Sequence, residues 1–156
     1  MLESLSQRVA DHLIKQGLVL ATAESCTGGW VAKLMTDIAG SSAYFDRGFV
    51  TYTNESKQDM LSVKESTLIQ HGAVSEATVT EMASGALRHS LANTAVAISG
   101  VAGPTGGTVE KPVGTVCFAW QRQAQQAQTA THYFIGNRDS VRQQAVEFIL
   151  LQLLKF

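Results

Sequence analysis

The stretch Leu-Ala-Thr-Ala-Glu-Ser-Cys-Thr-Gly-Gly, residues 20–29, most constrains how this chain can fold. The apolar run that begins at Leu18 predicts a short buried strand over 18–22, and the residues that follow the glycine pair predict a helix over about 29–37. A strand that leads into a helix through small polar residues and glycines presents those residues beside free backbone N–H groups. The residues so placed are Ser25, Cys26 and Thr27. This arrangement suits either a nucleophile with an anion-stabilising pocket or a phosphate cradle.

The rest of the chain alternates between helical and strand patterns, with a late pair of strands before a last helix. Gly17 is placed to end the first helix, and Asn54 and Ser75 are placed to begin two later ones. This order indicates an α/β fold, namely a three-layer sandwich with a mixed, mainly parallel sheet flanked by helices. We expect helices at 3–16, from 55 onward, at 65–71, at 76–91 and after Asn137 or Asp139, and strands at 48–53, 94–99, 113–120 and 128–135.

Length, charge and composition exclude several classes of protein. The 156 residues suit one domain over 1–156, and the net charge of -1 argues against a nucleic-acid partner. Two cysteines are too few for a disulfide framework, which favours a reducing, cytoplasmic setting. No apolar run approaches the roughly 20 residues needed to cross a membrane, and the polar N-terminus is not a signal peptide. No cluster of histidine or cysteine has metal-ligand spacing, so we expect neither a metal nor another cofactor.

Ser25 is the first candidate nucleophile, and it needs a base to remove its proton. The four histidines are scattered and Gly-x-Ser-x-Gly is absent, so a Ser-His-Asp triad is not supported. Lys57 is the best candidate base, because it lies in the first turn of the helix after the 48–53 strand, where a buried amine becomes neutral more easily. If that strand lies beside the first one, Ser25 and Lys57 meet at one edge of the sheet. The alternatives are that Ser25 only caps a helix, that Lys57 is solvated, or that Cys26 is the nucleophile.

Other polar residues are candidates for binding a substrate. The loop from Gly100 to Gly107 has glycines that let backbone N–H groups approach a ligand, although it is no P-loop and a plain tight turn is an alternative. Arg138 and Arg142 are four residues apart on one predicted helix, which suits a phosphate or carboxylate. Tyr52 and Thr27 offer hydroxyl groups near the predicted nucleophile. The candidate binding residues are Glu24, Gly28, Gly29, Ser41, Ser42, Gly100, Gly103, Thr105, Gly106, Lys111, Arg138 and Arg142.

Six motifs occur in order along nearly the whole chain. They are Ala-Glu-Ser-Cys-Thr-Gly-Gly, Gly-Ser-Ser, Gly-Phe-Val-Thr-Tyr-Thr-Asn-Glu-Ser-Lys, His-Gly-Ala-Val-Ser, Ile-Ser-Gly-Val-Ala-Gly-Pro and Lys-Pro-Val-Gly-Thr-Val. Together they resemble the CinA C-terminal domain family of nicotinamide-nucleotide amidases, in its stand-alone form. One departure is Thr105, where the family loop Gly-Pro-Asp-Gly-Gly has an aspartate; a lost carboxylate there would alter substrate affinity if it contacts ribose hydroxyls or orients Lys111.

The resemblance implies hydrolysis of nicotinamide mononucleotide to nicotinic acid mononucleotide and ammonia, in pyridine nucleotide (NAD) salvage. It implies a Ser–Lys arrangement at Ser25 and Lys57, with Thr27, Tyr52 and the Gly-rich loop lining the site. We expect backbone N–H groups around 27–29 to bind the oxyanion, and the phosphate to lie against Arg138, Arg142 or a helix N-terminus. The alternatives are a pyridine-nucleotide-binding protein without catalysis and an amidase for another small carboxamide. The small size and the late strand pair favour a homo-oligomer. The small-molecule substrate is what the resemblance implies.

Overall fold

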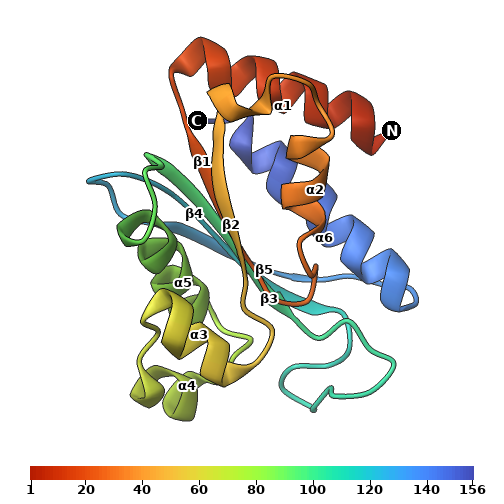
Figure 1. Ribbon diagram of the computed structural model, residues 1–156. Coiled ribbons are helices and arrows are strands. Elements are labelled where there is room, and N and C mark those ends of the chain that lie inside the picture. Colours follow the sequence, from red (N-terminus) through yellow and green to blue (C-terminus); the bar gives the residue numbers. More distant parts are fainter.

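The computed structural model describes residues 1–156 as a five-stranded sheet with helices on both faces (Figure 1). Its elements are α1 (Leu2–Gln16), β1 (Leu20–Glu24), α2 (Trp30–Thr36), a 3-10 helix η1 (Ser41–Ala43), β2 (Phe45–Val50), α3 (Asn54–Leu61), α4 (Glu65–His71), α5 (Glu76–Arg88), β3 (Thr94–Gly100), β4 (Thr115–Arg122), β5 (Gln128–Tyr133) and α6 (Arg138–Leu153). The strand order is β2-β1-β3-β4-β5; β2, β1 and β3 are parallel, and β4 runs antiparallel to both its neighbours. The predicted α/β sandwich with a mixed sheet is confirmed.

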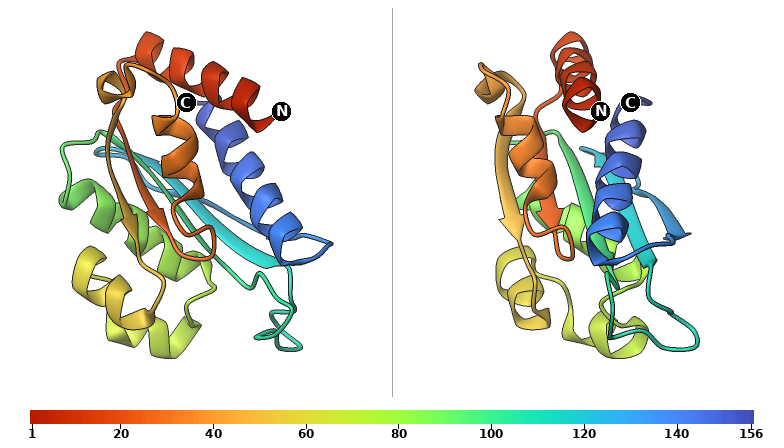
Figure 2. Two further views of the ribbon diagram at one scale, coloured as in Figure 1. Left: turned by 45° about the vertical axis from the view of Figure 1, so that its right-hand side comes forward. Right: turned by 90° about the vertical axis from the view of Figure 1, so that its right-hand side faces the viewer.

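The two faces of the sheet carry side chains of different size. Side chains alternate along a strand, so β1 directs Leu20 to one face and Ala21 and Ala23 to the other. The face with the larger side chains packs against α1, α2 and α6, whereas the alanine-rich face packs against α5 with α3 and α4 beyond it (Figures 1 and 2). The small residues allow α5 to lie close to the sheet. None of the helices combines the length and the apolar character needed to cross a membrane.

Several predicted ends of elements differ from the observed ones. The first strand begins at Leu20 rather than at 18, because the N–H of Val19 donates to Asn93 Oδ1 at 2.8 Å. The strand predicted at 48–53 is Phe45–Val50. The cap of α3 is Thr53 rather than Asn54, since the Thr53 hydroxyl accepts a hydrogen bond from the N–H of Ser56 at 3.1 Å. The predicted caps at Ser75 and Asn137 are confirmed, as is the helix end at Gly17.

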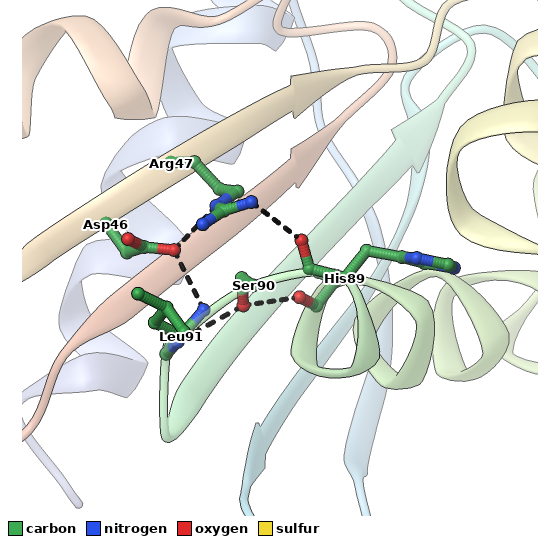
Figure 3. Close-up of polar contacts among 7 residues, drawn as sticks. Asp46, Arg47, His89, Ser90 and Leu91 are labelled. Carbon is green, nitrogen blue, oxygen red and sulfur yellow. Dashed lines mark hydrogen bonds and ion pairs between the residues drawn. The ribbon is translucent and has the colours of Figure 1, made fainter.

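A polar network joins the outer strand β2 to the connection between α5 and β3 (Figure 3). Arg47 Nε donates to Asp46 Oδ2 at 2.6 Å, and the N–H of Leu91 donates to the same oxygen at 3.0 Å. Arg47 Nη1 also donates to the carbonyl oxygen of His89 at 3.1 Å. The bond from the Leu91 N–H, followed by that from Arg47, lowers the pKa of Asp46. Because the chain turns toward β2 here, α5 ends at Arg88 rather than at the predicted residue 91.

The backbones of α3 and α5 approach each other closely at Gly85. A Cβ atom at this position would lie 2.0 Å from the carbonyl oxygen of Leu61, a distance that no real contact allows. Leu61 is the last residue of α3, the helix that also carries Lys57. The absence of a side chain at Gly85 therefore allows α3 to pack closely on α5. This packing helps to position Lys57, which α3 carries.

We predict that Gly85→Ala destabilises the protein, although alanine normally stabilises a helix interior relative to glycine. The added methyl group would push α3 from α5 and lower the free energy of unfolding by about 1–3 kcal/mol, the usual range for an overpacked core. Urea denaturation followed by circular dichroism measures this effect. Thr80→Ala, on the same helix, is the control and should stay within about 0.5 kcal/mol of the wild type. A Gly85→Ala protein as stable as the wild type would contradict the packing described here.

Candidate active site

A cavity of about 300 Å³ opens at the carboxyl ends of the parallel strands. Ligands of open α/β sheets commonly bind at this edge, because the loops that follow the strands converge there. Five segments form the walls: the turn after β1, the chain around the start of α3, the connection between α4 and α5, the end of β3 with its Gly-rich loop, and the start of α6. The predicted site residues that line it are Ser25, Tyr52, Lys57, Gly100, Gly103, Thr105, Gly106 and Arg138.

Ser25 and Lys57 meet at the floor of this cavity. Lys57 Nζ lies 3.0 Å from Ser25 Oγ, and both residues are buried. Their proximity follows from the topology, because β1 and β2 are adjacent parallel strands and both residues come shortly after the strand ends. The distance is that of a nucleophile hydrogen-bonded to its base. The predicted meeting of Ser25 and Lys57 is therefore confirmed as a contact.

The surroundings of Lys57 lower the pKa of its amine. The side chain is only 1% exposed, and no carboxylate lies within salt-bridge distance of its nitrogen. Burial lowers the pKa of Lys57, because the ammonium loses its hydration without gaining a counter-charge. The carbonyl oxygens of Thr51 and Tyr52 accept hydrogen bonds from Nζ at 2.9 and 3.2 Å. Nζ also lies within hydrogen-bond distance of Ser25 Oγ, to which it donates here at 3.0 Å. In the neutral form, which has two N–H groups, the bonds to the two carbonyl oxygens would leave the lone pair for Ser25.

Cys26 also lines the cavity, but its thiol is in the wrong state for a nucleophile. The side chain is buried, and burial raises the pKa of Cys26 to about 11. The thiolate is the reactive form of cysteine, and at neutral pH this group stays a thiol. The structure therefore favours Ser25 over Cys26.

Glu24 and Thr27 do not face the cavity, contrary to the expectation from the sequence. Glu24 is buried, and its Oε1 accepts hydrogen bonds from the Thr27 hydroxyl at 2.6 Å and the N–H of Val31 at 2.9 Å. Its Oε2 accepts from the N–H of Ala32 at 3.0 Å. This carboxylate therefore occupies the N-terminus of α2, which is not free to hold a substrate anion. Glu24 and Ser25 are consecutive at a strand end and so point to opposite faces of the sheet.

The two arginines of α6 reach different parts of the molecule. Arg138 lies over the cavity, where Nη1 donates to the carbonyl oxygen of Gly103 at 2.7 Å and Nη2 donates to the Tyr52 hydroxyl at 2.9 Å. Arg142 lies outside it and donates to the carbonyl oxygens of Cys26 and Thr27, at 3.0 and 3.2 Å. Of the two, only Arg138 is placed to contact a bound substrate.

The remaining predicted binding residues lie away from the cavity. Ser41 and Ser42 belong to η1, which precedes β2 and so lies at the opposite end of the sheet. Lys111 Nζ donates to the carbonyl oxygen of His71 at 2.6 Å and does not line the cavity. Gly28 and Gly29 also lie outside the lining.

Sequence reasoning missed Ser99 as a site residue. Ser99 lines the cavity on β3, beside the strand that leads to Ser25. Its position as the last residue before Gly100 at a strand's carboxyl end was the available signal. The histidine, cysteine and carboxylate side chains form no group of three that could hold a metal ion.

The chain is similar in sequence and in structure to several known proteins. The sequence model of the CinA C-terminal domain matches residues 2–156. Nicotinamide-nucleotide amidohydrolase PncC of Escherichia coli (strain K12) is 57% identical over 152 residues, which cover 97% of this chain and 92% of that protein. The protein of the same name from Enterobacter agglomerans is 52% identical over 154 residues, 99% of this chain and 94% of its own. The crystal structure of competence/damage inducible protein CihA from Agrobacterium tumefaciens superposes with a TM-score of 0.94 at 46% identity, covering 99% of this chain and 94% of that one.

We predict that Cys26 in the native protein resists alkylation by iodoacetamide at pH 8. Its thiol is both buried and, with a pKa of about 11, almost fully protonated at that pH. Peptide mass mapping after a timed exposure measures the modified fraction. The same protein in urea is the control, and there both cysteines should react. Rapid labelling of Cys26 in the native state would contradict the thiol environment described above.

Proposed function

The chain belongs to the CinA C-terminal domain family, and we propose that it hydrolyses the carboxamide of nicotinamide mononucleotide to nicotinic acid mononucleotide and ammonia, in NAD salvage. The name of the PncC relatives supports this substrate. The observation that carries the proposal is the buried Lys57 amine, which lies 3.0 Å from Ser25 Oγ with no carboxylate to hold its proton. A serine paired with a neutral base is the arrangement that acyl transfer requires.

In the proposed reaction, Lys57 accepts the proton of Ser25 as Oγ bonds to the carboxamide carbon. The C=O π electrons move to oxygen and give a tetrahedral oxyanion. Its collapse breaks the C–N bond, and the Lys57 ammonium protonates the departing nitrogen, which leaves as ammonia. A water molecule then repeats the addition, with Lys57 again as base, and releases the carboxylic acid and free Ser25. Each cycle consumes one water and returns Lys57 to its neutral form.

The oxyanion needs hydrogen-bond donors beside Ser25 Oγ. The N–H of Cys26 follows the nucleophile directly and has no acceptor within the protein, so we assign it this role. The N–H of Gly28, expected to contribute, instead donates to the carbonyl oxygen of Ser25 at 3.0 Å. The hydroxyl of Ser99 is a second donor on the cavity wall. Donors of this kind lower activation barriers by roughly 3–4 kcal/mol each.

Arg138 is the group that we assign to the phosphate of the substrate. It is the one arginine in the cavity lining, and the Gly-rich loop beside it has backbone N–H groups at Gly103, Thr105 and Gly106 without acceptors in the protein. Successive free N–H groups and a guanidinium together make an anion site. Tyr52 then acts in two ways: its hydroxyl holds Arg138, and its carbonyl oxygen orients Lys57.

We also propose that the protein is a single catalytic domain that acts in the cytoplasm. It binds neither nucleic acid nor a membrane, and it forms a homo-oligomer. The net charge of -1 and the two free cysteines support the setting. The edge strand β5 supports association, because its outer side is unpaired and the exposed side chains of Tyr133 and Ile135 lie at and just beyond its end. Light scattering coupled to gel filtration tests the oligomer.

We predict that Ser25→Ala and Lys57→Met each lower kcat for ammonia release from nicotinamide mononucleotide by about 10³-fold or more. The first change removes the nucleophile, and the second removes its base while keeping the side-chain volume. Two matched variants away from the cavity, Ser41→Ala and exposed Lys64→Met, should leave kcat unchanged. Turnover retained in Ser25→Ala would overturn the mechanism. Tight binding by the wild type without ammonia release would instead support a nucleotide-binding protein.

We predict that Arg138→Gln raises KM for nicotinamide mononucleotide by about 10- to 100-fold, the usual loss for a hydrogen bond to a charged group. The riboside lacks the phosphate, so its kcat/KM should change little. Steady-state assays with both substrates measure the difference. An equal loss on both would place the phosphate elsewhere.

A further inference from the structure

We propose that Arg142 is a positioning residue that orients and polarises the backbone N–H after Ser25, although it does not contact the substrate; this rests on the proposed function. Sequence reasoning had grouped it with Arg138 as a phosphate ligand. Its side chain instead lies behind the turn that follows β1, outside the cavity lining. There its guanidinium binds two consecutive backbone carbonyl oxygens, those of Cys26 and Thr27.

A chain of hydrogen bonds leads from Arg142 to the nucleophile. Arg142 Nη2 donates to the carbonyl oxygen of Thr27 at 3.2 Å, and the same peptide unit carries the N–H of Gly28. That N–H donates to the carbonyl oxygen of Ser25 at 3.0 Å, and the Ser25 peptide unit ends in the N–H of Cys26. Bonds in such a chain polarise one another, so the cation makes the Cys26 N–H a stronger donor. This is the group assigned to the oxyanion.

The turn is held from its other side by Glu24. The Glu24 carboxylate accepts from the Thr27 hydroxyl and from two N–H groups of α2, while Arg142 binds the Thr27 carbonyl oxygen. The side chain and the carbonyl group of Thr27 are thus fixed by opposite charges. Both Gly28 and Gly29 have positive φ angles, 62° and 98°, so the backbone of the turn follows a path that needs such support.

Arg142 itself is held in place by Trp30. The guanidinium carbon lies 5.5 Å from the centre of the indole ring, within the range of a cation–π contact. Lysine could keep the charge at this position, but it lacks the planar fork that binds two carbonyl oxygens at once. Displacement of a nucleophile or an oxyanion donor by about 1 Å can cost a factor of about 100 in rate.

The first test compares Arg142→Lys and Arg142→Gln with the wild type in steady-state kinetics on nicotinamide mononucleotide. We expect kcat to fall by about tenfold or more with KM within about twofold, because only the transition state uses the oxyanion donor. The second probe is the substrate analogue with an aldehyde in place of the carboxamide, to which Ser25 Oγ adds to give a tetrahedral hemiacetal. The affinity of each Arg142 variant for this analogue should fall by the same factor as its kcat/KM. Exposed Gln143→Ala, one residue further along α6, is the control that should change neither quantity. An unchanged kcat, or a rise in KM instead, would overturn the proposal.

A second test does not depend on catalysis. In ¹⁵N-labelled wild-type protein, the amide protons of Cys26 and Gly28 should resonate further downfield than in Arg142→Gln, because the relay polarises them. Equal shifts in the two proteins would overturn the relay whatever the activity. If the wild type releases no ammonia but the shifts differ, the proposed function fails and the relay stands.

Discussion

The buried amine of Lys57 is the interaction on which the site depends. An ammonium group so enclosed, with no carboxylate beside it, loses its hydration without compensation, and this lowers the pKa of Lys57. The carbonyl oxygens of Thr51 and Tyr52 accept hydrogen bonds from Nζ and so hold it beside Ser25 Oγ. Both carbonyls belong to the segment between β2 and α3, and the contact of α3 with α5 at Gly85 holds that segment in place. The packing of α3 against α5 therefore helps to set the position of Lys57 Nζ.

The turn after β1 lies between two groups of opposite charge. Its inner side carries the Glu24 carboxylate, bonded to the N-terminus of α2, and its outer side carries the Arg142 guanidinium. Neither charged group enters the cavity, which Ser25 and Cys26 line. Arg138, one helical turn before Arg142, is left as the cation of the cavity. Substrate binding and nucleophile positioning are thus assigned to two arginines of one helix.

The sequence predicted the parts of the site that follow from local pattern. The sequence predicted that Ser25 follows one strand directly. It also predicted that Lys57 lies in the helix that follows a neighbouring strand. Both residues were therefore expected at one edge of a parallel sheet. Glu24 and Arg142 lie outside the cavity, contrary to the expectation from the sequence, for two reasons. The alternation of side chains turns Glu24 away from the face that Ser25 occupies. Residues 138 and 142 share a helix face but lie about 6 Å apart along its axis, so they reach different loops, and only tertiary structure shows which.

The most direct test of the account is the titration of Lys57 by NMR, with lysine labelled at ¹³Cε and the resonance assigned from Lys57→Met. The account predicts that this one lysine titrates below the ordinary value of 10.5. Such a result would mean that the amine is available as a base for Ser25 at a pH where an exposed lysine is still charged. A Lys57 that titrates at or above the ordinary value would be a structural cation, and the proposed acyl transfer would lose its base.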